Sequence, residues 1–209
     1  SIKPISVSGT DRIVRFAFEY ARKHHRRKVT AVHKANIMKF SDGLFLDVAH
    51  DVAKEYKDIE FSHRIVDNMC MQLVQYPWQY DVLVLPNLYG DIISDLAAGM
   101  IGGLGLAPGA NVGKDVAVFE ATHGSAPDIA GMDRANPVGL ILSAVLMLRH
   151  LGEREAATWL EGAVANVLHD GTHVTADLKD DPHDPTAVGT TEMGAAIIER
   201  VHAHRAHDA

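Results

Sequence analysis

The sequence has a single cysteine, Cys70, so it forms no internal disulfide, and this usage is typical of reducing compartments. No apolar run approaches the roughly 20 residues that cross a membrane, and we expect no secretory signal peptide. Positive charge is scarce, since 20 Lys and Arg face 27 Asp and Glu for a net charge of −7. Nucleic acids and anionic membranes are therefore poor partners. The sequence predicts a cytoplasmic protein, or one of the mitochondrial matrix in a eukaryote.

The composition, with 47% apolar and 22% charged residues, is that of an ordinary globular chain. Its 209 residues suffice for one large domain or two modest ones. The first half alternates short β-branched runs with helical stripes, which is typical of an α/β domain. The expected strands are residues 1–7, 29–32, 59–66 and 82–85, and the expected helices begin near Thr10–Asp11, Ser41, Asp67 and Asp91.

The second half begins with a change of composition, to a glycine-rich segment. The segment GGLGLAPGANVG at 102–113 contains five glycines, and we expect a loop or hinge there. It lacks the third glycine of a dinucleotide fingerprint and follows a helix instead of a strand, so a Rossmann turn is excluded. A short strand at 116–119 and helices at 137–151, 156–168 and 191–204 follow. The helix at 137–151 is apolar all round, which predicts burial on most sides.

Asp91 and Asp95 are the clearest candidate site in the first half. Their spacing of four places both carboxylates on one face of a helix, one turn apart. Two carboxylates suit a hard divalent cation such as Mg²⁺ or Mn²⁺. The same pair also suits a solvated acidic edge on which Asp91 caps the helix. The spacing alone leaves both interpretations open.

Four separated segments together resemble one family. They are VHKANIMKFSDGLF (32–45), VDNMCMQL (66–73), NLYGDIISDLAAG (87–99) and FEATHGSAPDIAGMDRANP (119–137). These blocks, in this order, resemble the metal-dependent decarboxylating dehydrogenases of 2-hydroxy diacids, which include the isocitrate, 3-isopropylmalate and homoisocitrate enzymes. The first and third blocks look most like the NAD-dependent isocitrate branch. The resemblance extends from Ile2 to about Ala196.

The resemblance implies the α/β isocitrate/isopropylmalate dehydrogenase fold, with mixed sheets, flanking helices and two domains. Residues 1–101 would be the end of a clasp strand plus the small, dimer-forming domain. Residues 102–209 would be the C-terminal part of the large, cofactor-binding domain. The N-terminal part of the large domain, with the substrate-binding arginines and a catalytic tyrosine, is not matched. We expect that missing segment as a partner, because the helix at 137–151 would otherwise expose part of an apolar face.

The resemblance also implies catalytic roles. Asp91 and Asp95 would hold Mg²⁺ or Mn²⁺ together with Asp67 from a second subunit, and Asp91 would also belong to the catalytic group. Lys34 would take part in proton transfer, again across the subunit interface, and Asn36 would contact substrate or cofactor. Taken singly, Lys34 suits a surface lysine at a strand end, and Asp67 suits a helix cap. The implied assembly is a homodimer with shared active sites, or a higher oligomer built from it.

The implied cofactor is NAD. In the family the adenosine half lies over a loop that matches residues His123, Gly124, Ser125, Ala126, Pro127, Asp128 and Ile129. NADP-dependent members carry Lys-Tyr where this chain has Asp128-Ile129, and a carboxylate there would repel a 2′-phosphate. Asn136 and Asp177 match further adenosine contacts, although Asn136 before a proline also suits an ordinary helix start.

The reaction implied is the oxidative decarboxylation of isocitrate to 2-oxoglutarate, a step of the tricarboxylic acid cycle. Homoisocitrate or 3-isopropylmalate remains open as substrate, because the residues that would discriminate among the diacids lie mainly in the unmatched segment. A non-catalytic regulatory or assembly subunit of a heteromeric isocitrate dehydrogenase is a further alternative. The presence of Lys34, Asp67, Asp91 and Asp95 in this chain argues against that alternative.

Overall fold

The computed structural model describes residues 2–207, with side chains described for residues 2–203. The chain divides into two compact units, Ser1–Ala97 and Ala98–Ala209. In the described part of the chain, no helix is both long and apolar enough to span a bilayer.

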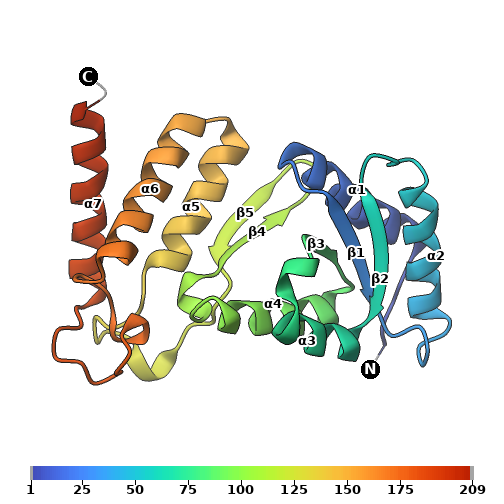
Figure 1. The fold of residues 1–209 in the computed structure, drawn as a ribbon, viewed down its shortest axis with the longest axis horizontal. Helices are drawn as coiled ribbons and strands as arrows, with labels where there is room; N and C mark the ends of the chain where they lie inside the picture. Colours follow the sequence, from blue (N-terminus) through green and yellow to red (C-terminus); the bar gives the residue numbers. More distant parts are fainter. Residues whose placement is uncertain (1, 208–209) are drawn as a thin grey trace. The chain divides into compact units, whose positions relative to one another are not determined.

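The first unit is built around a parallel sheet of three strands in the order β2-β1-β3 (Figure 1). The strands are β1 (Lys28–His33), β2 (Glu60–Ile65) and β3 (Val82–Val84). In the register of the sheet, Lys28 lies beside Glu60 and Val29 beside Val82. Four helices connect and cover the strands: α1 (Val7–Lys23), α2 (Ser41–Ala53), α3 (Val66–Gln75) and α4 (Asn87–Met100).

Alternate residues of β1 supply the cores on the two faces of this sheet. Val29 and Ala31 pack with α1 and α2, where Phe18 is fully buried and stacks on Tyr56. Val32 points to the opposite face and packs with α3 and α4. This inward-outward alternation follows from the two-residue repeat of a strand. Both faces of β1 are covered, which explains why all of its residues from Val29 to His33 are buried.

The N-terminal segment differs from its prediction. Helix α1 begins at Val7, not near Thr10–Asp11, because the Ser6 hydroxyl accepts a hydrogen bond from the Gly9 N–H and caps the helix. Residues 2–6 pair with no strand in the described chain, so the strand expected at 1–7 does not form within it.

Helix α4 also begins earlier than expected. Its first residue is Asn87, which places Asp91 in the second turn instead of at the N-cap. The capping interpretation of Asp91 is therefore wrong. The two carboxylates of Asp91 and Asp95 stay on the helix with the spacing of one turn.

The second unit contains an antiparallel hairpin and three long helices (Figure 1). The strands are β4 (Pro108–Val112) and β5 (Ala117–Ala121), and the helices are α5 (Val138–Leu151), α6 (Arg154–Asp170) and α7 (Thr190–His207). The core joins Val138 of α5, Val164 and Val167 of α6, and Met193 and Ile197 of α7. Gly152, with φ of 90°, ends α5 in the left-handed conformation that glycine adopts without steric cost.

The glycine-rich segment is not only a loop. Within 102–113, residues 108–112 form β4, which pairs with β5 from Pro108–Ala121 to Val112–Ala117. The buried Ser143 of α5 fixes this hairpin: its hydroxyl accepts the Gly109 N–H at 3.2 Å and lies 2.9 Å from the Glu120 carbonyl oxygen. Tertiary contacts therefore override the low strand propensity of glycine and proline.

Helix α5 leaves some of its apolar residues exposed. Val138, Ser143 and Val145 are buried, but Leu140 and Leu151 are 58% and 65% exposed. Positions 140, 147 and 151 repeat at helical spacing, so the exposed apolar residues form one stripe. Outside this stripe most residues of the helix are buried or half-buried, as predicted, and the expectation of an exposed apolar face on this helix is also met.

Candidate functional site

Lys34 and Asp67 lie together at one edge of the parallel sheet. Lys34 follows the last residue of β1, and Asp67 stands in the first turn of α3, directly after β2. Parallel strands end at the same edge, and the register places His33 beside Ile65. The Lys34 ammonium therefore reaches Asp67 and donates to its Oδ2 at 2.8 Å. This hydrogen bond is the main reason why the pKa of Asp67 falls below its ordinary value.

Asp91 and Asp95 form a second pair of groups, on the exposed face of α4. Both residues are solvent-exposed, while Ile93 between them is buried against β1 and α3. Neither carboxylate forms an ion pair with another described residue. Exposed, unpaired carboxylates one turn apart match the oxygen ligands that Mg²⁺ and Mn²⁺ prefer.

These two pairs do not meet within one chain. Among the described residues, no three His, Cys, Asp or Glu side chains lie close enough together to hold a metal ion. Asp67 is instead bound by Lys34 of its own chain. The four residues thus form a lysine–carboxylate pair on one edge of the sheet and a carboxylate pair on α4.

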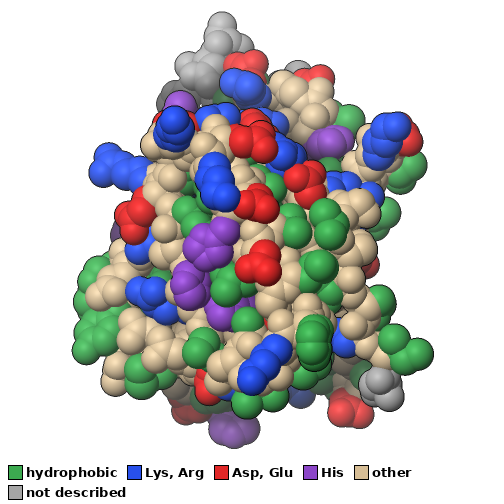
Figure 2. Space-filling view, turned by 90° about the vertical axis from the view of Figure 1, so that its right-hand side faces the viewer, with side chains coloured by type: hydrophobic (Ala, Val, Ile, Leu, Met, Phe, Trp, Pro, Cys, Tyr) green, Lys and Arg blue, Asp and Glu red, His purple; other side chains and the backbone are tan. Residues whose placement is uncertain are grey.

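A histidine cluster adjoins the Lys34 turn, and sequence reasoning missed it. Histidine side chains gather in the middle of the face shown in Figure 2. The His33 Nδ1 accepts the Ala35 N–H at 3.0 Å, so its Nε2 must carry the proton and donate to the His63 Nδ1, also at 3.0 Å. Burial, followed by the neighbouring charge of His63, lowers the pKa of His33; burial, followed by His50, lowers that of His63. Both rings are therefore neutral at pH 7.

The second unit contains a cavity of about 760 Å³. It brings together most of the residues expected to bind a cofactor: His123, Gly124, Ser125, Ala126, Ile129, Asn136 and Asp177. Its other lining residues are Leu104, Gly105, Ala130, Gly131, Asp133, Arg134, Ala135, Ala176 and Thr190. Pro127 and Asp128 are exposed on the same loop, in the 3₁₀ turn Pro127–Ile129, but do not line the cavity.

Asn136 and Asp177 are in direct contact. The Asn136 Nδ2 donates to the Asp177 Oδ2 at 3.0 Å, and the Asn136 Oδ1 accepts the Val138 N–H at 3.0 Å. Gly105 permits this arrangement, because a Cβ at that position would lie 2.9 Å from the Asn136 Cβ. The amide therefore satisfies the first N–H of α5, from one residue before the N-cap Pro137, and at the same time lines the cavity.

The comparison with known proteins decides the family. The isocitrate/isopropylmalate dehydrogenase model matches residues 1–197. The chain belongs to this family. It is 57% identical, over 179 residues, to the alpha subunit of the mitochondrial NAD isocitrate dehydrogenase of Macaca fascicularis, and 54% identical, over 178 residues, to the probable counterpart in Caenorhabditis elegans. These matches cover 85% of this chain and 52% and 50% of the two relatives.

Solved structures of other proteins share the fold. The isocitrate dehydrogenase of Methylococcus capsulatus superposes with a TM-score of 0.93 at 54% identity, over 96% of this chain and 58% of that one. The TT0538 protein of Thermus thermophilus superposes with a TM-score of 0.92 at 48% identity, over 96% of this chain and 40% of that one. The predicted α/β fold of the family is confirmed. The chain spans about half the length of the curated relatives that it matches.

Some residues that line the cavity were not predicted from the sequence. Gly105 stands in the glycine-rich segment, where its contact with Asn136 depends on a neighbour 31 positions away. Among the described lining residues, Arg134 alone carries a permanent positive charge. It stands within the block that resembles the family, between the loop and Asn136, but has no motif of its own. Asn36 lies exposed in the turn after Lys34, outside this cavity.

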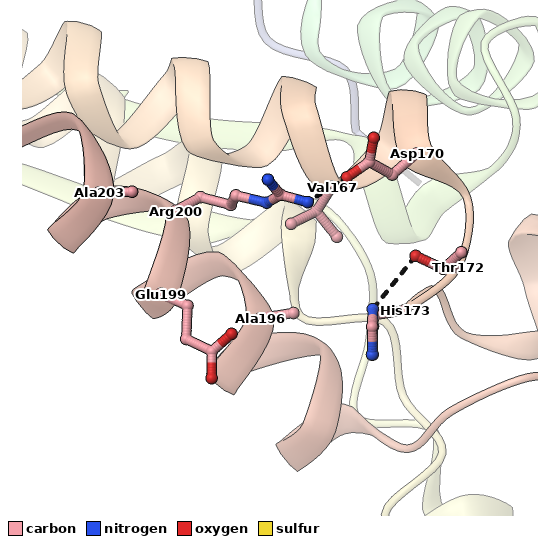
Figure 3. A pocket seen from close by; sticks show the side chains of 8 residues that line it. All are labelled: Val167, Asp170, Thr172, His173, Ala196, Glu199, Arg200 and Ala203. Carbon is pink, nitrogen blue, oxygen red and sulfur yellow. Dashed lines mark hydrogen bonds and ion pairs between the residues drawn. The ribbon is translucent and has the colours of Figure 1, made fainter.

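A second, smaller cavity lies between α6 and α7 (Figure 3). Its volume is about 390 Å³, and its polar rim includes Asp170, Thr172, His173, Glu199 and Arg200. Arg200 is ion-paired with Asp170, and the Thr172 hydroxyl lies 3.2 Å from the His173 Nδ1. None of the residues predicted to bind metal, substrate or cofactor lines this cavity.

Proposed function

We propose that this chain is part of an NAD-dependent isocitrate dehydrogenase, which converts isocitrate and NAD⁺ into 2-oxoglutarate, CO₂ and NADH. The observation that supports this most is the contact of Lys34 with Asp67 beside a helix that displays Asp91 and Asp95 to solvent. An amine can move the proton of a hydroxyl during its oxidation, and carboxylates can hold the divalent cation that stabilises charge as a carboxylate is lost. The relatives at 57% and 56% identity are named as NAD isocitrate dehydrogenase alpha subunits.

The residues divide the chemical work between them. Lys34 takes the proton of the substrate hydroxyl and later returns a proton to the product, directly or through a water molecule. Asp91 and Asp95 of one subunit, with Asp67 of another, hold Mg²⁺ or Mn²⁺. When bound, the cation stabilises the negative charge that develops on the substrate oxygen as CO₂ leaves. Asn36, exposed in the Lys34 turn, contacts the substrate or the nicotinamide end of the cofactor.

A homodimer with shared sites is the proposed assembly, alone or within a higher oligomer. Its support is that Asp67 does not meet Asp91 and Asp95 within the described residues of one chain, and that Asp67 lies beside Lys34. Two subunits would complete the ligand set in a symmetric way, because each contributes a lysine–carboxylate pair to one site and a carboxylate pair to the other. The proposed place of action is the cytoplasm or, in a eukaryote, the mitochondrial matrix.

The cavity of the second unit is the proposed site for the adenosine half of NAD. The contact between Asn136 and Asp177 supports this, since it places two polar side chains at one wall of a cavity large enough for a nucleoside. The loop at 123–129 forms another wall through His123, Gly124 and Ser125. Asp128, exposed on this loop, would repel the 2′-phosphate of NADP.

The substrate is tested with the complete gene product, Mn²⁺ and NAD, by measuring NADH with isocitrate, homoisocitrate and 3-isopropylmalate in turn. We expect the highest kcat/KM with isocitrate, and a lower value when NADP replaces NAD. If the protein oxidises homoisocitrate or 3-isopropylmalate but not isocitrate, that diacid is the substrate and the proposed substrate is wrong. Metal binding without oxidation of any of the three diacids would instead indicate a regulatory or assembly subunit.

Gly105→Ala tests the cofactor cavity. The added methyl would lie within 2.9 Å of the Asn136 Cβ and 3.1 Å of its Nδ2, so the amide must move away from its contacts. We expect the KM for NAD to rise about tenfold, the change that corresponds to loss of about one well-formed polar contact, while kcat changes little.

Gly194→Ala is the matched control for that variant. Gly194 lies on α7, and a Cβ there has no neighbour within 4 Å. Alanine in a helix interior is favoured over glycine, so the control keeps its fold and its KM for NAD. Equal KM values for wild type and Gly105→Ala would exclude this cavity as the NAD site.

A further inference from the structure

The peptide groups of the Lys34 turn are fixed on both sides by contacts that the proposed chemistry does not use. The Lys34 N–H donates to the Asp42 Oδ2 at 2.7 Å. The Lys34 carbonyl accepts the N–H groups of Ile37 and Met38 at 3.0 and 2.8 Å. The next N–H, of Ala35, donates to His33. These hydrogen bonds therefore fix the backbone from which the Lys34 side chain extends, and the Lys34 ammonium binds Asp67.

Among the described residues that contact the Lys34 backbone, only Asp42 is charged and buried. It has no exposed surface, although it lies in the first turn of α2. A buried carboxylate is costly unless charged and polar groups surround it. Lys3 meets that need by donating to the Asp42 Oδ1 at 2.5 Å, and the Ser41 hydroxyl lies 3.3 Å from the same oxygen.

Lys3 connects this carboxylate to α4. Its ammonium also donates to the Tyr89 hydroxyl at 3.0 Å and lies 4.1 Å from the centre of the Tyr89 ring. Tyr89 stands on α4, two residues before Asp91. One buried carboxylate thus links the Lys34 turn to the helix that carries Asp91 and Asp95. All of these residues belong to the first unit.

The charge state of Asp42 agrees with this geometry. Burial alone would raise the pKa of its carboxyl, but the hydrogen bonds from Lys3, the Lys34 N–H and Tyr89 outweigh burial and lower the pKa. Asp42 is therefore an anion at pH 7, able to accept from the backbone and the ammonium at once.

We propose that Asp42 is a positioning residue for Lys34: it holds the Lys34 N–H in place and, through Lys3 and Tyr89, couples the Lys34 turn to α4. The catalytic consequence rests on the proposed function of Lys34, whereas the placement of the Lys34 ammonium does not. A displacement of about 1 Å in a catalytic group can reduce turnover by up to about a hundredfold, so a backbone contact of this kind matters for rate.

Asp42→Asn is the main test, made in the complete gene product. Asparagine keeps the shape, but its amide cannot accept both the Lys34 N–H and the Lys3 ammonium, because one of its two polar atoms is a donor. We expect kcat to fall about tenfold while the KM for NAD stays unchanged. Combined with Lys34→Ala, Asp42→Asn should cause no further loss, because it acts through Lys34. A further loss in the double variant would overturn the proposal.

A second measurement follows Lys34 without using activity. The rate at which acetic anhydride labels Lys34 is compared by mass spectrometry with the rate at Lys54, whose side chain is 75% exposed. In Asp42→Asn we expect faster labelling of Lys34 and no change at Lys54. Altered labelling in an enzyme that oxidises no diacid would support the positioning role and reject the proposed function. Unchanged labelling of Lys34 would reject the positioning role, whatever the activity.

Two more variants control for folding. Asp47→Asn makes the same substitution on the same helix, at an exposed carboxylate away from the Lys54 reference, and should leave kcat and Lys34 labelling unchanged. Tyr89→Phe removes only the hydroxyl, which accepts from Lys3 and also hydrogen-bonds Asp42, and keeps the ring. If Asp42→Asn does not fold, Tyr89→Phe still decides: we expect a smaller loss in kcat, about threefold, because Lys3 keeps its contact with Asp42, together with faster Lys34 labelling. Wild-type values for both readouts would contradict the coupling to α4.

Discussion

Replacing Lys34 with alanine is expected to reduce the kcat of isocitrate oxidation by about a thousandfold, within the range that a general acid–base group contributes. The variant loses the amine that moves the substrate proton, and water in its place is not held at the same point. The fold should survive, because Asp67 is 69% exposed in its pair with Lys34 and pairs open to solvent contribute about 0–1 kcal/mol to stability. Steady-state NADH formation, with thermal unfolding in parallel, measures both quantities.

Lys54→Ala is the matched control for this prediction. Lys54 is also a lysine in an ion pair with an aspartate, but it lies at the end of α2 with its side chain 75% exposed. Its replacement should leave kcat unchanged. The KM for NAD should be unchanged in both variants, since the proposed adenosine cavity lies in the second unit. A Lys34→Ala enzyme that keeps more than about a tenth of wild-type kcat would exclude proton transfer by this residue.

The alternation of strands and helices could be predicted because it depends on local periodicity. β3 is a short apolar run, β1 is short and rich in β-branched residues, and α2 and α3 carry stripes that match helical spacing. The exceptions depend on contacts that periodicity does not contain. β4 forms from a glycine- and proline-containing segment because β5 and Ser143 supply its hydrogen-bond partners. Helix α1 begins at Val7 because of one serine hydroxyl.

In the candidate site, too, some residues could be predicted from the sequence and others depend on contacts between distant residues. Lys34, Asp67, Asp91 and Asp95 could be named from their likeness to a family, and the contact of the first two follows from their places after parallel strands. The role of Asp42 could not be predicted. Its partner Lys3 is 39 positions away, and Tyr89 is 86 positions from Lys3. An ion pair between such distant residues, with its carboxylate fully buried, forms only once the sheet and its helices have assembled.

Replacing Asp95 with alanine is expected to weaken Mn²⁺ binding by more than about a hundredfold, because even residues that merely orient a ligand contribute 10- to 100-fold to metal affinity. The metal-free protein should not be destabilised. Asp91 and Asp95 are like charges one turn apart on an exposed helix face, and alanine removes their repulsion while favouring the helix. Isothermal titration with Mn²⁺ and thermal unfolding with and without EDTA separate these two effects.

Asp47→Ala, at an exposed carboxylate on α2, should bind Mn²⁺ like the wild type. Mn²⁺ at about a hundred times its dissociation constant should stabilise the wild type by about 2.7 kcal/mol, and Asp95→Ala by almost nothing.

If each site draws Lys34 and Asp67 from one subunit and Asp91 and Asp95 from the other, mixed dimers of Lys34→Ala and Asp95→Ala contain one intact site. Random re-association of the two inactive variants should then restore about a quarter of wild-type activity. No recovery, with mixed dimers present, would mean that each site is built within a single subunit.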